Sequence, residues 1–117
     1  MKSRQNILYY DMENKIEVEA HERYDRWWEK LRDKRAKVRI YARVEQIQEY
    51  GNFGNHKFLR DGVWELKINY GPGYRVYYTR VGGQIVLLLG GGDKSTQEHD
   101  IERAVQLAKE VKRENEK

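Results

Sequence analysis

The segment from residue 63 to residue 94 constrains the fold more than any other part of the chain, and it reads VWELKINYGPGYRVYYTRVGGQIVLLLGGGDK. Two glycine-containing turns, at 71–73 and 82–83, divide it into three runs of strand length. Pro72 and Gly73 stand at the second and third positions of the first turn, 71–74, which is the residue choice of a type II turn. We therefore expect a β-meander of consecutive antiparallel strands.

The composition sets limits on the class of protein. The chain has 117 residues, of which 38% are hydrophobic, so it can form one ordinary domain with a modest core. Its net charge of +4 and pI near 9.2 are compatible with a polyanionic partner. The absence of cysteine excludes a disulfide scaffold, a thiolate metal site and a cysteine nucleophile. Because no run approaches 18 apolar residues and the start of the chain is polar, we expect neither a membrane span nor secretion, and we expect a cytoplasmic protein.

Two apolar stripes with helical spacing precede the meander. The first predicts a short amphipathic helix, and the second predicts a basic helix over residues 34–48, so we expect a helical hairpin. A strand is expected before the hairpin, near residues 15–20, and residues 1–15 are expected to form an N-terminal extension. The stripes consist of Tyr24, Trp27, Trp28 and Leu31, and then of Ala36, Ile40, Val44 and Ile47.

The C-terminal part predicts a third helix. Ser95 and Glu98 have the spacing of a capping box, and an apolar stripe from Ile101 to Val111 predicts a helix over about residues 96–113. The glycine- and asparagine-rich segment 50–55 separates the hairpin from strands that begin near Lys57. The predicted order is β-α-α-β-β-β-α. We expect an α+β fold with a small antiparallel sheet of three or four strands and with the helices on one face.

Strand alternation assigns the meander residues to two faces. In the run from Val63 to Tyr70, the set Trp64, Leu66, Ile68 and Tyr70 should meet the helices, and the alternate residues should face the other way. Applying the same rule to the next strand, we expect Lys67, Arg75 and Tyr77 to cluster on the open side of the sheet. The run from Ile85 to Leu89 is apolar at every position, as in a central strand covered on both faces.

Two sequence motifs carry a family resemblance. GVWELKINYGPGYRVYY and LLLGGGDKSTQEHDIERA, in this order and after the helical hairpin, resemble the HigB-like addiction-module killer proteins of the RelE and ParE toxin superfamily. The resemblance covers about residues 16–113, so residues 16–117 are expected to form a RelE/ParE-like toxin domain. It implies the toxin of a type II toxin–antitoxin pair, whose usual activity is ribosome-dependent cleavage of messenger RNA without a cofactor.

The resemblance also implies partners. These are messenger RNA, the ribosome and a helix-turn-helix, HigA-like antitoxin. Operator DNA would be bound only through the antitoxin.

Three basic residues are the expected centre of a metal-independent ribonuclease site. Such cleavage needs a group that takes the proton of the 2′-hydroxyl and cations that stabilise the charged phosphorane. Arg75, in GYR, corresponds to the strand arginine of the family and is expected to hold the scissile phosphate. Lys67 stands where relatives commonly carry a basic residue and is the expected general base. Lys94 matches another basic position and would stabilise charge at the start of the last helix.

Further candidates come from side-chain chemistry. Tyr77 is expected to stack on or orient a base, and His56 and His99 are candidates for proton transfer because imidazole exchanges protons near neutral pH. Basic residues of the second helix and the following strand are expected to contact RNA or the ribosome. This set consists of Lys34, Arg35, Lys37, Arg39, Arg43 and Lys57.

Alternatives to these roles stay open. Arg75 could instead pair with Glu65 across the hairpin as a structural residue. The best-characterised ribonucleases of the superfamily carry more basic residues where this chain has Glu65, and a tyrosine where it has His99 and Asp100. A non-enzymatic, ParE-like inhibitor of DNA gyrase is therefore the main alternative, and an inactive RNA-binding or antitoxin-binding module is the third. Convergence of Lys67, Arg75 and Lys94 on one concave face would favour the nuclease.

Other chemistries lack their motifs. GGGDKS does not have the spacing of a nucleotide-binding P-loop, and no serine nucleophile motif is present. The three histidines are spread over the chain and predict no metal site.

Overall fold

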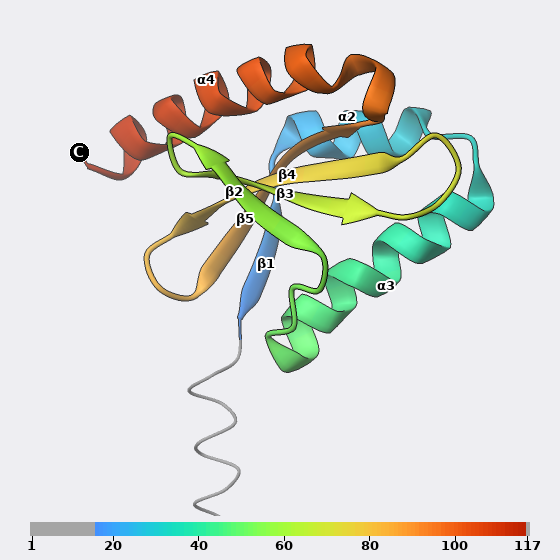
Figure 1. Ribbon diagram of the computed structural model, residues 1–117. Helices are drawn as coiled ribbons and strands as arrows, with labels where there is room; N and C mark the ends of the chain where they lie inside the picture. Colours follow the sequence, from blue (N-terminus) through green and yellow to red (C-terminus); the bar gives the residue numbers. More distant parts are fainter. Residues whose placement is uncertain (1–15, 117) are drawn as a thin grey trace, which may run out of the picture.

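The computed structural model describes residues 16–116 and arranges them as a five-stranded sheet with helices on both faces (Figure 1). The expected N-terminal extension, residues 1–15, lies outside the described residues. Among residues 16–116, no helix has the length and apolar composition needed to span a bilayer. The elements are β1 (Glu17–Ala20), α2 (Glu22–Lys30), α3 (Lys34–Tyr50), β2 (His56–Arg60), β3 (Val63–Ile68), β4 (Tyr74–Val81), β5 (Ile85–Gly92), the 3-10 turn η1 (Lys94–Thr96) and α4 (Gln97–Asn115).

The sheet has the strand order β1-β5-β4-β3-β2. The meander β3-β4-β5 is antiparallel as predicted, and β2 extends it on the far side of β3. β1 pairs in parallel with β5, from Glu17 opposite Ile85 to Ala20 opposite Leu88. The predicted count of three or four strands is thus too low. The apolar strand β5 becomes an inner strand because β1 occupies its other edge.

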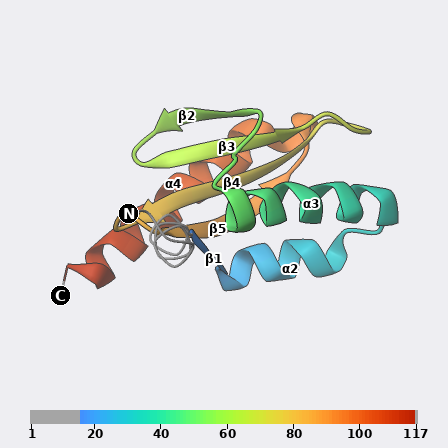
Figure 2. The same cartoon turned by 90° about the horizontal axis from the view of Figure 1, so that it is seen from below.

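The helical hairpin forms as predicted, and local capping fixes its ends. His21 Nδ1 accepts the backbone N–H of Arg23 at the start of α2, and Asp33 Oδ1 accepts that of Arg35 at the start of α3, each at 3.1 Å. α3 ends at Gly51, whose φ of 65° is the left-handed conformation that glycine adopts at helix ends. Figure 2 shows α2 and α3 as consecutive helices joined by a short connection, and both pack into the same apolar core.

The start of α4 differs from the prediction. Asp93 caps η1, because its Oδ1 accepts the backbone N–H of Ser95 at 2.8 Å and also the Ser95 hydroxyl. Thr96, the residue before α4, makes no side-chain cap bond. The predicted capping box of Ser95 with Glu98 is therefore wrong: Ser95 lies inside η1 and donates to Asp93.

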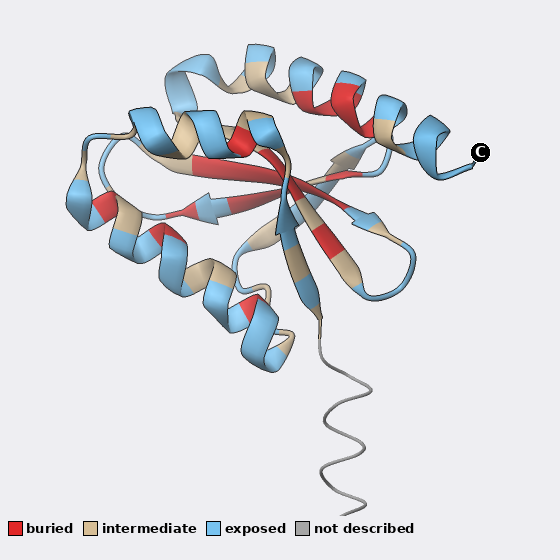
Figure 3. Ribbon diagram, turned by 180° about the vertical axis from the view of Figure 1, so that it is seen from behind, coloured by how far each residue is buried: buried red, intermediate tan, exposed pale blue. Residues whose placement is uncertain are grey.

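Two apolar cores lie on opposite faces of the sheet, and Figure 3 shows the buried positions along the strands and on the inner sides of the helices. Leu66 and Ile68 pack against α2 and α3, which confirms the predicted strand face. The expectation that all helices share one face is wrong, because the apolar stripe of α4 covers the other face. That second core contains Val63, Tyr77, Leu89, Ala104, Val105, Leu107 and Ala108.

Candidate functional site

The turn between β3 and β4 brings the three expected catalytic cations together. Lys67 lies directly opposite Arg75 in the strand register, and Arg75 lies opposite Gly92 of β5 on its other side. Lys94 reaches the same place from η1: a Cβ on Gly73 would lie 3.7 Å from the Cβ of Lys94 and 3.2 Å from Arg75 Nη1. The three cations converge because the β3–β4 turn and the C-terminal end of β5 lie at the same end of neighbouring strands.

The turn itself closes one residue earlier than predicted. The N–H of Gly73 donates to the carbonyl of Tyr70 at 3.1 Å, whereas the sequence placed the turn at 71–74. Gly71 and Gly73 have φ values of 56° and 81°, which other residues adopt at a cost. This conformation turns the carbonyl of Gly73 toward Arg75, whose Nη1 donates to it at 2.7 Å.

Arg75 is held under the surface. Its side chain is 7% exposed, and its Nε lies 3.6 Å from Oε2 of Glu65, whose side chain is 3% exposed. Glu65 Oε2 also accepts a hydrogen bond from Nε2 of Gln97, the first residue of α4, at 2.8 Å. The ion pair that the sequence offered as the structural role of Arg75 is thus present. Together with the hydrogen bond from Gln97, this ion pair connects α4 to β3 and β4.

One nitrogen of this guanidinium is left without a partner. Arg75 Nε is buried and makes no hydrogen bond within residues 16–116, since its separation from Glu65 is longer than a hydrogen bond. Lys67 and Lys94 are exposed. The arrangement combines one fixed, partly satisfied cation with two solvated ones, which is a suitable set for an oxyanion or phosphate.

Carboxylates lie close to the three cations and reduce the positive charge of this place. Asp93 lies close enough for Arg75 to affect its ionisation: hydrogen bonds from the Ser95 hydroxyl and from backbone N–H groups lower the pKa of Asp93, and the charge of Arg75 lowers it further. The carboxylates close to the three cations are Glu65, Asp93 and Asp100, the last of which lies against Gly92. A hollow of about 340 Å³ is lined by neighbours of Arg75 and Lys94, among them Tyr74, Gly92 and Asp93, and also by Thr96 and Asp100.

Tyr77 does not lie on an open face, and that prediction is wrong. Its side chain is fully buried under α4, and its hydroxyl has no hydrogen-bond partner among the described residues. Burial raises the pKa of Tyr77, and the nearby carboxylates of Glu65 and Asp100 add to the effect, so the hydroxyl stays a donor. The strand alternation was correct, but α4 covers the face to which it assigned this residue.

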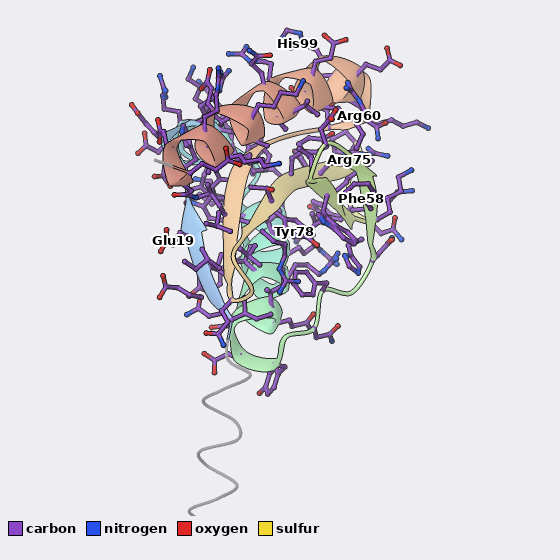
Figure 4. The ribbon with its side chains drawn as sticks, turned by 90° about the vertical axis from the view of Figure 1, so that its left-hand side faces the viewer. Glu19, Phe58, Arg60, Arg75, Tyr78 and His99 are labelled. Atoms are coloured by element: carbon purple, nitrogen blue, oxygen red, sulfur yellow. The ribbon has the colours of Figure 1, made fainter. Side chains whose placement is uncertain are left out.

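The two histidines do not join the cations. His56 lies opposite Leu66 and therefore on the α2 and α3 side of the sheet, where its ring stacks on Phe53 and Trp64 and its Nδ1 is 3.0 Å from the hydroxyl of Tyr78. His99 is exposed on α4, with Nε2 3.5 Å from Nη1 of Arg103. Figure 4 shows His99 on the outer side of α4 and Arg75 beneath the helix.

Most residues of the expected RNA-contact set are available at the surface. Lys34, Arg35 and Arg39 of α3 are exposed, and so is Lys57 of β2. Arg39 lies over the ring of Tyr70, at 4.7 Å from its centroid.

Two members of that set are occupied within the molecule. Lys37 is half-buried and lies over the ring of Trp28, at 5.1 Å from its centroid. Arg43 donates from Nη1 to the carbonyl of Lys67 (2.6 Å) and from Nη2 to those of Phe53 (2.8 Å) and Asn55 (2.9 Å). Burial lowers the pKa of Arg43. Arg43 thus fastens α3 to the segment that carries Lys67, and its contact with RNA stays a prediction.

A second cluster of cations was not found from the sequence. Arg23, Arg26 and Lys30 of α2 face Arg103 of α4 across a hollow that Trp27 also lines. We call this surface the α2–α4 groove. The spacing of 23, 26 and 30 marks one helical stripe, but only the position of α4 on this side of the sheet brings Arg103 to it.

Comparisons with known proteins agree with this fold. A family model described as phage derived protein Gp49-like (DUF891) matches residues 26–112. An uncharacterized protein of Haemophilus influenzae is 47% identical over 96 residues, which are 82% of this chain and 96% of the relative.

A solved chain in the intact E. coli RelBE toxin–antitoxin complex superposes with a TM-score of 0.55 and 18% identity, covering 67% of this chain and 95% of that one. The expected RelE-like α+β fold is confirmed. The narrower HigB-like assignment stays a prediction.

Proposed function

The chain belongs to the phage-derived Gp49-like family, and on this premise we propose that it is the toxin of a type II toxin–antitoxin pair that cleaves messenger RNA at the ribosome, in the cytoplasm. The observation that carries the proposal is the meeting of Lys67, Arg75 and Lys94 at the β3–β4 turn. The likeness of the fold to a chain of a toxin–antitoxin complex supports it.

The proposed chemistry is transesterification within the RNA. Lys67, exposed beside Arg75, reacts as the neutral amine: it accepts the proton of the 2′-hydroxyl and becomes an ammonium, while the 2′-oxygen attacks the adjacent phosphorus. Arg75 and Lys94 bind the non-bridging oxygens and stabilise the charge of the phosphorane. The bond to the 5′-oxygen then breaks, and this oxygen takes a proton from solvent. The products are a 2′,3′-cyclic phosphate and a 5′-hydroxyl end.

The fixed position of Arg75 supports this role. The bond to the Gly73 carbonyl and the proximity of Glu65 hold the guanidinium in one orientation before substrate arrives. A preorganised cation stabilises developing charge without the cost of reorienting during the reaction. The exposed residues Lys34, Arg35, Arg39 and Lys57 are proposed to contact RNA or the ribosome outside the reacting phosphate.

An antitoxin is the proposed protein partner. The E. coli structure that resembles this fold is a toxin–antitoxin complex, which supports a partner of this class for the present chain. We propose a helix-turn-helix, HigA-like antitoxin that neutralises the toxin by covering the basic surface at the β3–β4 turn. The pair would bind operator DNA through the antitoxin.

A second candidate function is favoured by the burial of Arg75. With 7% of its side chain exposed and Glu65 beside it, Arg75 also fits a purely structural ion pair. The chain would then be a non-enzymatic, ParE-like inhibitor of DNA gyrase, or an inactive module that binds RNA or the antitoxin.

A reconstituted assay separates these candidates. Purified protein is added to a translation system with a defined message, with and without ribosomes, and to a DNA gyrase supercoiling reaction. The nuclease predicts message fragments with 5′-hydroxyl ends, lost in Lys67→Ala and kept in Lys109→Ala, an exposed lysine elsewhere. Inhibition of supercoiling with an intact message would support the gyrase inhibitor instead.

A further inference from the structure

The α2–α4 groove is the feature of the molecule that the proposed cleavage chemistry leaves unused. Four cations and one indole surround it: Arg23, Arg26, Lys30 and Arg103, with Trp27 between them. Within residues 16–116, Arg23, Lys30 and Arg103 form no ion pair, and Arg26 has only an exposed contact with Glu22 at 3.6 Å. Exposed pairs of this kind contribute little, so the positive charge is available to a ligand.

The groove is continuous with the candidate site. Three adjoining hollows share Trp27, and two of them also share Lys30. The hollow that contains Tyr74, Gly92 and Asp93 reaches the surroundings of Arg75. Tyr74 precedes Arg75 in the sequence, Gly92 lies opposite it in the strand register, and Asp93 follows Gly92. A chain lying in the groove would therefore pass from α2 and α4 to the β3–β4 turn.

We infer that the α2–α4 groove is a track for the sugar–phosphate backbone of single-stranded RNA on one side of the reacting phosphate. The identity of the occupant as RNA rests on the proposed function. Planar guanidinium groups on both walls, Arg23 and Arg103, suit phosphate oxygens, and the half-buried indole of Trp27 offers an aromatic surface to a base.

A buried donor lies beside this track. Beside Arg23 and Arg103 lies a hollow of about 120 Å³ that Tyr77 and Gly90 help to line. The Tyr77 hydroxyl is buried and has no partner in the described chain, which is unusual for a buried polar group. A Cβ on Gly90 would meet no atom within 4 Å, so the space in front of this residue is open. A small widening of this hollow would let a phosphate oxygen accept a hydrogen bond from the hydroxyl.

The carboxylates along the path are already engaged. Asp100 accepts from the hydroxyl of Thr96, and Asp93 accepts from the hydroxyl of Ser95. Burial raises the pKa of Asp100. The α2–α4 groove itself is lined by four cations and by no carboxylate, so its own charge is positive.

The test measures binding to a fluorescein-labelled, single-stranded RNA 12-mer by anisotropy at several salt concentrations, using the full chain. Arg23→Gln with Arg103→Gln is compared with Lys109→Gln with Lys112→Gln, which removes the same charge from exposed positions elsewhere on α4. The groove pair should weaken binding about tenfold or more, and removing two phosphate contacts should lower the salt slope by about 1.4. The control pair should change affinity by no more than about twofold.

Tyr77→Phe is the local test, because it removes only the hydroxyl. We expect RNA affinity to fall about threefold to tenfold while the melting temperature is kept. Equal effects of the two charge pairs, or unchanged affinity in Tyr77→Phe, would overturn the inference. The groove pair is also tested for binding to an acidic, glutamate-rich peptide. If it loses peptide binding while RNA binding is unchanged, the groove belongs to a protein partner, and the inference is overturned as well.

The result is separable from that of the proposed function. If wild-type protein cuts no message but the groove pair alone loses RNA binding, the track stands without the nuclease. If messages are cut and the groove pair binds RNA as well as wild type, the nuclease stands and the track does not.

Discussion

The ion pair of Glu65 and Arg75 offers a quantitative test of how the candidate site is built. Both side chains are almost fully buried, and each has one further hydrogen bond, to Gln97 and to the Gly73 carbonyl. Removing one partner of a buried pair leaves an uncompensated charge and costs about 3–5 kcal/mol. The 3.6 Å separation of Nε and Oε2 places this pair at the lower end of that range.

We therefore expect Arg75→Met to lower the free energy of unfolding by about 3 kcal/mol, or the melting temperature by about 10 °C for a domain of this size. Glu65→Gln, which keeps an acceptor for Gln97, should cost about 2 kcal/mol. In the double variant both charges are gone, so its loss should be smaller than the sum of the single losses by at least about 2 kcal/mol.

The assay is urea unfolding followed by tryptophan fluorescence, with the four proteins compared at one pH and salt concentration. Additive losses would show that the two charges do not interact. An unchanged free energy of unfolding in Arg75→Met would show that the guanidinium is not held as the structure has it. Either result refutes the view of Arg75 as a preorganised cation.

Three further predictions concern the frame around the site. Arg43→Gln should destabilise the fold by about 2–3 kcal/mol in urea unfolding, because three carbonyls lose their donor, whereas Arg39→Gln, at an exposed position, should cost less than about 1 kcal/mol. Gly91→Ala should cost about 2 kcal/mol or more in the same assay, because its Cβ would lie 2.6 Å from the ring of Trp27; a wild-type midpoint would contradict the packing. Burial raises the pKa of Tyr78 from 10.0 to about 12, so the protonated form is favoured in the fold, and this contribution is complete below pH 10 and lost as the pH rises to 12. The contribution to the free energy of unfolding is about 2–3 kcal/mol. Measured between pH 10 and pH 12, the free energy of unfolding should therefore fall less in Tyr78→Phe than in wild type.

The elements themselves could be predicted because their signals are local. The glycine turns, the helical stripes and the strand alternation each depend on residues close in the sequence, and all three correspond to observed structure. The position of α4 could not be predicted in this way. The stripe from Ile101 to Val111 shows that a helix buries one side, but it does not show against which face of the sheet.

The same limit explains the errors at the site. The parallel pairing of β1 with β5 depends on residues far apart in the chain, so no turn motif announces it. Tyr77 was assigned to the correct strand face, but that face is covered by α4. Arg23 and Arg103 meet only through the placement of two helices, so the α2–α4 groove has no sequence signature.

The family resemblance located the cations of the site more reliably than their environment. Lys67, Arg75 and Lys94 meet at one turn, whereas the sequence had left their convergence open. The burial of Arg75 and its contact with Glu65 depend on α4, whose first residue, Gln97, donates a hydrogen bond to the same carboxylate. The environment of a motif residue is set by the tertiary structure around it.

The most direct test of the central claim is to map the 5′ ends of cellular messages after induction of the protein in bacteria without an antitoxin. Wild type, Lys67→Ala and the exposed control Lys109→Ala are compared. Growth arrest with new 5′-hydroxyl ends inside translated messages, absent in Lys67→Ala and present in Lys109→Ala, is the predicted result. Growth arrest with intact messages in the wild type would contradict the nuclease.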